Sequence, residues 1–253
     1  MTTSNTQKQI TSITPPFGYG GIVPVLKTHK VLATDGLVPE PLRRSNAIPL
    51  TISEIPRASR DYPVVFASAD GGESFGVVAL LGLGEKENLF VGEDGKWRGD
   101  AYLPAYLRRY PFCMATVTRG GQAGEERIVC VEEAMLDTQR GLPLERQEGE
   151  KLSWWSERLH LLQEYEADLI RTRHMCDTLK KLGILERFSA QAVSDGGEVM
   201  NLGGMFRVDE QRLEALKADD LRMLIRKGIM GRLYAHMISL DNLGRLLDRR
   251  KEG

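Results

Sequence analysis

The sequence predicts an α+β fold in which a mostly antiparallel sheet packs against one long helix and against C-terminal helices. Three observations predict it. Short β-branched runs between glycine-rich turns fill residues 46–131. Apolar residues recur at helical spacing over 153–182, and again beyond residue 219. We therefore expect a single domain, 46–253, with a β-rich part at 46–131 and a helix-rich part at 150–253.

Residues 1–45 precede this domain and are expected to form an extended N-terminal arm. The glycine-rich run from Phe17 to Gly21 is not a phosphate-binding loop, because no Lys-Ser/Thr pair ends it and no strand precedes it. Prolines interrupt any regular element in this segment, at Pro15, Pro16, Pro24, Pro39 and Pro41.

Local turn and cap signals divide the β-rich part. Ser53 is expected to cap a short helix that ends near Asp61, and the Asp94-Gly95 pair predicts a hairpin turn. A short helix over 102–110 is expected to stop before Pro111. The expected strands cover 48–52, 62–67, 75–83, 89–91, 112–118 and 126–131, with Gly120-Gly121 in the loop of the last hairpin.

The helix-rich part opens with a helix expected from Ser153 to Leu182, with Gly183 as its C-cap. Its apolar residues recur at spacings of three, four or seven, which places them on one stripe. They are Trp155, Leu159, Leu162, Leu169, Cys176 and Leu179.

A β-hairpin is expected to follow over 188–208, with its turn at Ser194 to Gly197. Asp209 is a typical N-cap for a short helix, and Asp219 is a typical N-cap for a longer one. Gly228 and Gly231 each weaken that longer helix by about 1 kcal/mol relative to alanine. They indicate either a break in the helix or a close helix contact.

The overall charge argues against a nucleic-acid-binding surface, because 34 Lys and Arg residues face 35 Asp and Glu residues. One segment departs from this balance. From Leu221 to Gly253 the chain carries eight basic and three acidic residues. Two interpretations stay open: cations placed favourably near a helix C-terminus, or a basic surface that contacts an acidic partner or a membrane.

The cysteine pattern and the N-terminus indicate where in the cell the protein is expected. Cys113, Cys130 and Cys176 form no Cys-x-x-Cys pair, which is typical of buried, reduced thiols. The polar N-terminus shows no secretory signal peptide, and the apolar run at 77–83 is too short to span a bilayer. We expect a cytoplasmic protein without an integral membrane segment; export by a non-cleaved signal is the alternative.

No metal or cofactor is expected. Glu157 and His160 have the Glu-x-x-His spacing of di-iron bundles, but His174 has no glutamate three residues before it, so a surface Glu/His pair is favoured. Gly82 and Gly84 follow an apolar run, as in a dinucleotide-binding turn, but the third glycine of that motif is missing.

The catalytic candidates are weak. His236 and Ser239 lie three residues apart on a predicted helix and could meet, but no orienting acid accompanies them. In an enzyme hypothesis, His236 acts as general acid or base, while Ser239, Tyr110 and Asn88 orient the substrate.

The densest aromatic and basic cluster runs from Trp97 to Pro111. Rigid rings beside guanidinium groups suit the recognition of a peptide, a carboxylate or a planar group. The alternative is aromatic packing with arginine stems lying across the rings. The candidate partner-binding residues are Trp97, Tyr106, Arg108, Arg109, Tyr110 and Asn88.

Several blocks resemble the bacterial SapC family, in order and at matching total length. They are Arg60-Asp-Tyr-Pro-Val-Val-Phe-Ala, Glu87-Asn-Leu-Phe, Asp94-Gly-Lys-Trp, Tyr102-Leu-Pro-Ala-Tyr-Leu-Arg-Arg-Tyr-Pro-Phe and Tyr234-Ala-His-Met-Ile-Ser-Leu-Asp-Asn. The resemblance covers residues 48–250. It implies a link to surface-layer proteins or an accessory role near outer-membrane uptake systems, and it carries over no catalytic residues.

Three hypotheses follow. The favoured one is a non-enzymatic binding or accessory protein that engages a protein or peptide partner linked to the cell envelope. The second is an enzyme, or an enzyme subunit, with a pocket around His236. The third is a structural surface-layer component. The sequence leaves the oligomeric state open.

Overall fold

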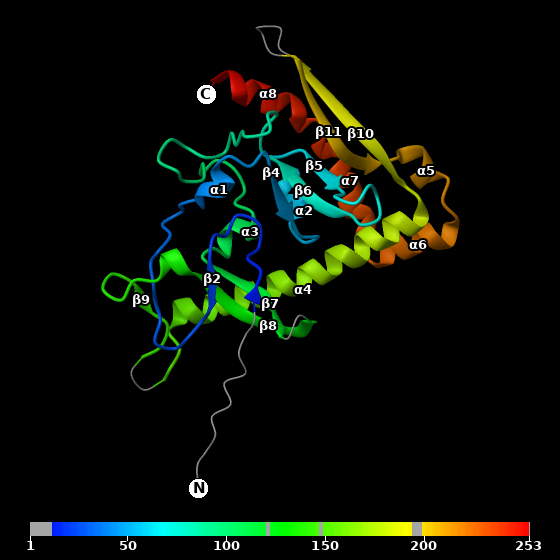
Figure 1. Ribbon diagram of the computed structural model, residues 1–253. Coiled ribbons are helices and arrows are strands. Elements are labelled where there is room, and N and C mark those ends of the chain that lie inside the picture. Colours follow the sequence, from blue (N-terminus) through cyan, green and yellow to red (C-terminus); the bar gives the residue numbers. More distant parts are fainter. Residues whose placement is uncertain (1–11, 120–121, 147–148, 194–198, 253) are drawn as a thin grey trace. The chain divides into compact units, whose positions relative to one another are not determined.

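The computed structural model describes residues 12–119, 122–146, 149–193 and 199–252 (Figure 1). The expected turns at 120–121 and 194–197, and the first residues of the expected arm, lie outside these ranges. The chain divides into two compact units. The first contains residues up to 35 and 109–163, and the second contains 36–108 and 164–253.

An antiparallel sheet forms the first unit, with the strand order β1-β7-β8-β2. Its strands are β1 (Ser12–Ile13), β2 (Ile22–Pro24), β7 (Phe112–Arg119) and β8 (Gln122–Glu132). A separate pair joins β3 (Lys30–Val31) to β9 (Leu142–Pro143), and a 3-10 helix covers Glu133–Met135. The segment expected as an arm thus supplies three short strands of this unit.

A cluster of buried apolar side chains holds the first unit together. Phe112 and Val131 face one another across β7 and β8, and both are almost fully buried. They pack with Trp155 and Leu162 from the beginning of helix α4 (Ser153–Leu182). The apolar spacing that predicted this helix therefore places its first turns on a sheet face.

A second antiparallel sheet, with the order β10-β11-β5-β6-β4, forms the centre of the second unit. Its strands are β4 (Ala47–Leu50), β5 (Val64–Ala67), β6 (Gly76–Leu80), β10 (Leu185–Val193) and β11 (Val199–Val208). Val64, Val65 and Phe66 of the central strand are at most 1% exposed, which explains why this run is continuously apolar.

Short helices surround that sheet within the second unit. Helix α7 contacts β5, β11 and α2, so it lies against the middle of the sheet. The helices are α1 (Glu40–Arg43), α2 (Ile55–Ala58), α3 (Ala105–Arg108), α5 (Glu210–Glu214), α6 (Ala218–Arg226), α7 (Ile229–Ser239) and α8 (Asn242–Glu252). The predicted α+β class is confirmed.

The helix expected beyond residue 219 is divided into α6, α7 and α8. The first break lies at Gly228, whose φ of 66° is left-handed and unfavourable for other residues. Asp219 is not the N-cap, because Lys217 has that position; Asp219 lies instead in the first turn of α6, where its charge is favourable. Asp209 is confirmed as the cap of α5, since it accepts a hydrogen bond from the Arg212 backbone N–H.

Two expected details of the β-rich part are wrong. Ser53 does not cap α2, because the N-cap position belongs to Glu54, whose carboxylate is buried and hydrogen-bonded. The run 89–91 forms no strand; Val91 makes only an isolated bridge with Trp97. In the part of the chain that the structure describes, no helix is both long and apolar enough to cross a membrane.

Candidate functional site

His236 lies on the buried side of α7, with 1% of its surface exposed. Its Nε2 accepts a hydrogen bond from the Val208 N–H at 3.1 Å, and its Nδ1 lies 2.6 Å from the Val64 carbonyl oxygen. The neutral tautomer with the proton on Nδ1 satisfies both contacts. Burial lowers the pKa of His236 to about 4, so the ring is uncharged at neutral pH.

The imidazole takes the place of a strand-to-strand hydrogen bond. Strands β5 and β11 pair at Phe66–Phe206 and Ala67–Met205. Continued in the same register, this pairing would place Val64 opposite Val208. His236 bridges these two residues instead, and so closes the sheet where the direct pairing ends.

Ser239 completes the same arrangement from the next turn of α7. Its Oγ accepts a hydrogen bond from the Val64 N–H at 2.9 Å and donates one to the His236 carbonyl at 2.6 Å. Both backbone groups of Val64 are therefore satisfied by side chains of α7. The histidine and the serine hold a helix on a sheet, and neither side chain is directed at solvent.

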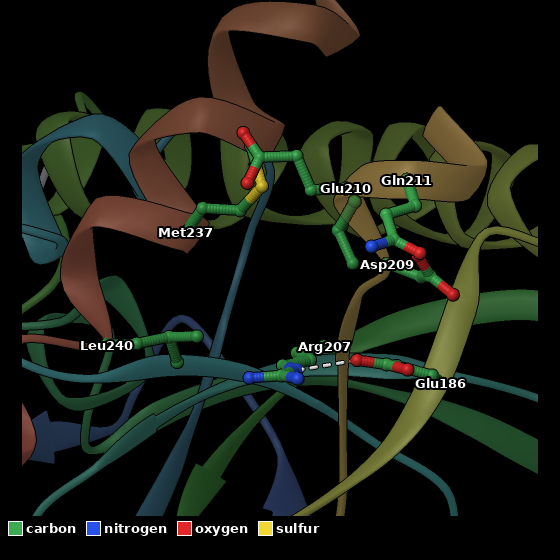
Figure 2. A pocket seen from close by; sticks show the side chains of 8 residues that line it. Glu186, Arg207, Asp209, Glu210, Gln211, Met237 and Leu240 are labelled. Atoms are coloured by element: carbon green, nitrogen blue, oxygen red, sulfur yellow. Dashed lines mark hydrogen bonds and ion pairs between the residues drawn. The ribbon is translucent and has the colours of Figure 1, made fainter. Parts of the chain in front are cut away.

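A pocket of about 500 Å³ adjoins α7 at Met237 and Leu240. Figure 2 shows Arg207 and Glu186 joined across its floor, with Met237 and Leu240 on one side and the first residues of α5 on the other. The Arg207 Nε lies 2.7 Å from a Glu186 carboxylate oxygen. His236 is not among the lining residues, although its hydrogen-bond partner Val208 and its chain neighbour Met237 are, so the imidazole itself does not open into the pocket.

The predicted cluster from Trp97 to Pro111 is divided between the two units. Tyr106 and Arg108 belong to the second unit, while Arg109 and Tyr110 belong to the first. Tyr106 and Arg109 are 5% and 3% exposed, whereas Arg108 is exposed. Of these four residues, Arg108 is the one whose side chain solvent reaches most readily.

Trp97 belongs to an aromatic group in the second unit. Its ring stacks on Phe90 with centroids 5.9 Å apart, and both rings contact Tyr62 edge-on. Asn88 holds this loop, because its amide donates to the Leu42 carbonyl and accepts from the Phe90 N–H. Trp97 and Asn88 therefore pack and position the loop.

Arg108 is held in place on Tyr102. Its guanidinium lies 5.7 Å from the ring centroid, its Nη2 donates to the tyrosine oxygen at 3.0 Å, and its Nε donates to the Leu103 carbonyl at 3.1 Å. Tyr102 in turn donates to the buried carboxylate of Glu54, which also accepts the Ala105 N–H at 2.6 Å. Burial and the Glu54 charge raise the pKa of Tyr102 to about 12, which keeps its hydroxyl protonated.

Tyr110 and Arg109 pack around Tyr19 in the first unit. The Arg109 guanidinium lies 5.5 Å from the Tyr19 ring centroid, and the Tyr19 and Tyr110 centroids are 5.4 Å apart. Burial, with a contribution from Glu132, raises the pKa of Tyr110 to about 12. A phenol in this state is protonated at neutral pH and is a poor general base.

The basic C-terminal segment contacts its own unit. Arg249 pairs with Asp100 at 2.8 Å, and Arg250 pairs with Glu87 at 2.8 Å. Arg245 donates to the Arg60 carbonyl at 3.1 Å. Arg249, Arg245 and Arg60 line a small pocket. The sequence reasoning missed it, because Arg60 and Arg245 are 185 residues apart and share no local pattern.

The cysteines are poor nucleophiles. Cys113 and Cys130 lie opposite one another on β7 and β8 and are fully buried. Burial raises their pKa values to about 12 and about 11, and it raises that of Cys176 to about 12. Thiolates are the reactive form, so these side chains behave as small apolar groups.

Glu157 and His160 both lie on the surface of α4. Among the described residues, no group of three or more His, Cys, Asp and Glu side chains is arranged to hold a metal ion.

Comparison with known proteins places most of the chain in one family. The family model SapC matches residues 28–246. No curated protein and no solved structure matches the chain.

Proposed function

The chain belongs to the SapC family, and we propose that it is a non-enzymatic binding or accessory protein that engages a protein or peptide partner linked to the cell envelope. The observation that carries the proposal is the exposed guanidinium of Arg108, which is held over the Tyr102 ring. An arginine fixed in this way loses less side-chain entropy when it meets a partner.

The support beneath Arg108 strengthens this argument. Tyr102 is anchored by Glu54, a side chain that is 4% exposed and also accepts hydrogen bonds from the Thr51 backbone and hydroxyl. A contact group that is supported by a buried network keeps its geometry in the free protein. Tyrosine and arginine are also the residue types enriched at the centres of protein interfaces.

The candidate catalytic residues support the same choice. His236 and Ser239 make their hydrogen bonds to the backbone of Val64 and Val208, as described above. A general base must reach a substrate proton, and these atoms are already bonded inside the unit. We therefore favour binding over the enzyme hypothesis.

The test is affinity purification of tagged full-length protein from the native host, followed by quantitative mass spectrometry. We expect Arg108→Ala to lose one or more envelope-associated partners that the unchanged protein recovers. The variant keeps Arg109, because this side chain is only 3% exposed and its replacement would disturb the first unit. Arg226→Ala is the matched control, since this arginine is exposed on α6.

Equal recovery of every partner by the unchanged protein, by Arg108→Ala and by Arg226→Ala would contradict the proposal.

Cell fractionation is a second, independent test of the proposal. Recovery of the protein as a constituent of an assembled surface layer would replace a binding or accessory role with the structural one.

A further inference from the structure

The small pocket beneath α8 is lined by guanidinium-bearing residues from distant parts of the second unit. Its volume is about 90 Å³. Arg245 and Arg249 stand four residues apart on α8 and therefore on one face of the helix. The remaining lining residues are Arg60, Asp61, Phe90 and Leu246.

Each of the three arginines retains hydrogen-bond donors, but they differ in how they are held. Within the described part of the chain, the Arg60 guanidinium has no hydrogen-bond or ion-pair partner, and it is the backbone carbonyl of Arg60 that Arg245 bonds. Arg245 uses Nη1 for the Arg60 carbonyl, which leaves its Nε and Nη2 as donors. Arg249 is held differently, since its guanidinium lies 4.5 Å from the Phe90 centroid and pairs with Asp100.

The acidic groups nearby neutralise only part of the positive charge of the three arginines. The Asp61 carboxylate accepts the Tyr102 N–H at 2.8 Å and is thus directed at the backbone. Asp100 is paired with Arg249, and that hydrogen bond lowers the pKa of its carboxyl group. Counting only the lining residues and Asp100, the ion-pair partner of Arg249, three guanidinium groups and two carboxylates leave one positive charge, which a single carboxylate would neutralise.

The size of the pocket limits what it can hold. At about 90 Å³ the pocket is much smaller than a site for a whole ligand. Pockets for whole ligands measure about 300–1,000 Å³. This pocket fits one small anionic group that projects from a larger molecule, with the buried Leu246 beneath it.

We infer that this pocket binds a carboxylate presented by an acidic peptide segment. Guanidinium groups recognise carboxylates through paired N–H donors, and a monoanion matches the uncompensated charge better than a phosphate dianion does. The inference deepens the proposed function. It rests on that function in one respect, namely that the partner is a protein or peptide. It gives that partner an acidic character and adds a contact point that is separate from Arg108.

The test follows the arginine Nε–Hε resonances of the full-length protein by NMR. The probe is acetyl-Glu-Glu-Glu-amide at low ionic strength, since screening shortens the reach of these charges. We expect the resonances of Arg60 and Arg245 to shift with the glutamate peptide and to stay unchanged with acetyl-Gln-Gln-Gln-amide. Inorganic phosphate is a third arm and is expected to bind more weakly than the glutamate peptide.

Variants separate the pocket from general surface charge. Arg60→Gln and Arg245→Gln should each weaken peptide binding about fivefold, the effect of losing one partly exposed ion pair. Arg226→Gln removes the same charge from α6 and should bind like the unchanged protein.

Equal binding of the glutamate and glutamine peptides would overturn the inference, as would unchanged binding by both pocket variants. Tighter binding of phosphate would overturn the carboxylate assignment. Each of these outcomes leaves the Arg108 purification result unaffected, so failure of the pocket and failure of the proposed function are distinguished.

Discussion

The buried imidazole of His236 makes the stability of the second unit depend on pH in a calculable way. In the folded state its pKa is lowered from 6.5 to about 4, chiefly because burial disfavours the charged ring. The unfolded chain therefore binds a proton at a higher pH than the folded chain does. The contribution of His236 is fully present above about pH 6.5 and is lost as the pH falls towards 4.

The magnitude follows from the same values. One pKa unit corresponds to about 1.4 kcal/mol, so the fall from 6.5 to about 4 sets an upper value of about 3 kcal/mol. Protonation also converts Nε2 from an acceptor into a donor facing the Val208 N–H, which removes that hydrogen bond.

The perturbation that isolates this effect is His236→Gln, because glutamine does not titrate. At pH 7.5 we expect the variant to lose about 1–3 kcal/mol of unfolding free energy, the cost of leaving a buried backbone group unsatisfied. Urea unfolding at pH 7.5, 6.5, 5.5 and 4.5 gives both stability curves. The difference between the two proteins should shrink by about 1 kcal/mol or more between pH 6.5 and 4.5.

Carboxylates titrate in both proteins and cancel in this difference. If the two curves run parallel over the whole range, the imidazole is not the buried neutral bridge described above. If His236→Gln is as stable as the unchanged protein at pH 7.5, the hydrogen bonds of His236 to Val64 and Val208 do not stabilise the fold as described.

Other perturbations test other parts of the fold. Glu54→Gln should cost about 3 kcal/mol in urea unfolding, because its buried carboxylate accepts four hydrogen bonds; a loss below about 0.5 kcal/mol would contradict this. Gly228→Ala should lower the stability by about 1 kcal/mol, since φ is 66° there, and Gly231→Ala, within α7, serves as the control that loses nothing. Cys113 and Cys130 should resist a thiol reagent at pH 8 until urea unfolds the protein, and rapid labelling of the folded chain would show that they are accessible.

Elements with a strong local signal were predicted well. Helix α4 runs from Ser153 to Leu182, and Gly183 follows it with a φ of 65°, as the apolar stripe and the C-cap signal indicated. Asp209 caps α5 through the expected hydrogen bond. In each case the residues that decide the structure lie within a few positions of one another.

Predictions failed where a distant contact outweighed a local preference. Ser53 is a good helix cap by type, but Glu54 takes the position because its carboxylate also receives the N–H of Ala105 and the hydroxyl of Tyr102. The run 89–91 has strand-like residues, yet Asn88 holds it as a loop by bonding to Leu42, 46 residues earlier. Propensity is a weak signal when a tertiary contact competes with it.

The aromatic-arginine segment shows the same limit for function. Its composition indicated a place to look for binding, but composition does not separate the exposed Arg108 from the buried Arg109 next to it. That difference arises from burial, since one residue ends α3 in the second unit and the other belongs to the first unit. The segment's role in binding a partner stays a prediction.

By itself, the sequence determined the α+β class, the long helix and the family, because periodic apolar spacing and ordered motifs are written in consecutive residues. Only the tertiary structure decided that His236 bridges Val64 and Val208 and that Arg60 meets Arg245 across 185 residues. Such contacts depend on how folded elements pack, and packing between distant segments leaves no repeating pattern along the chain.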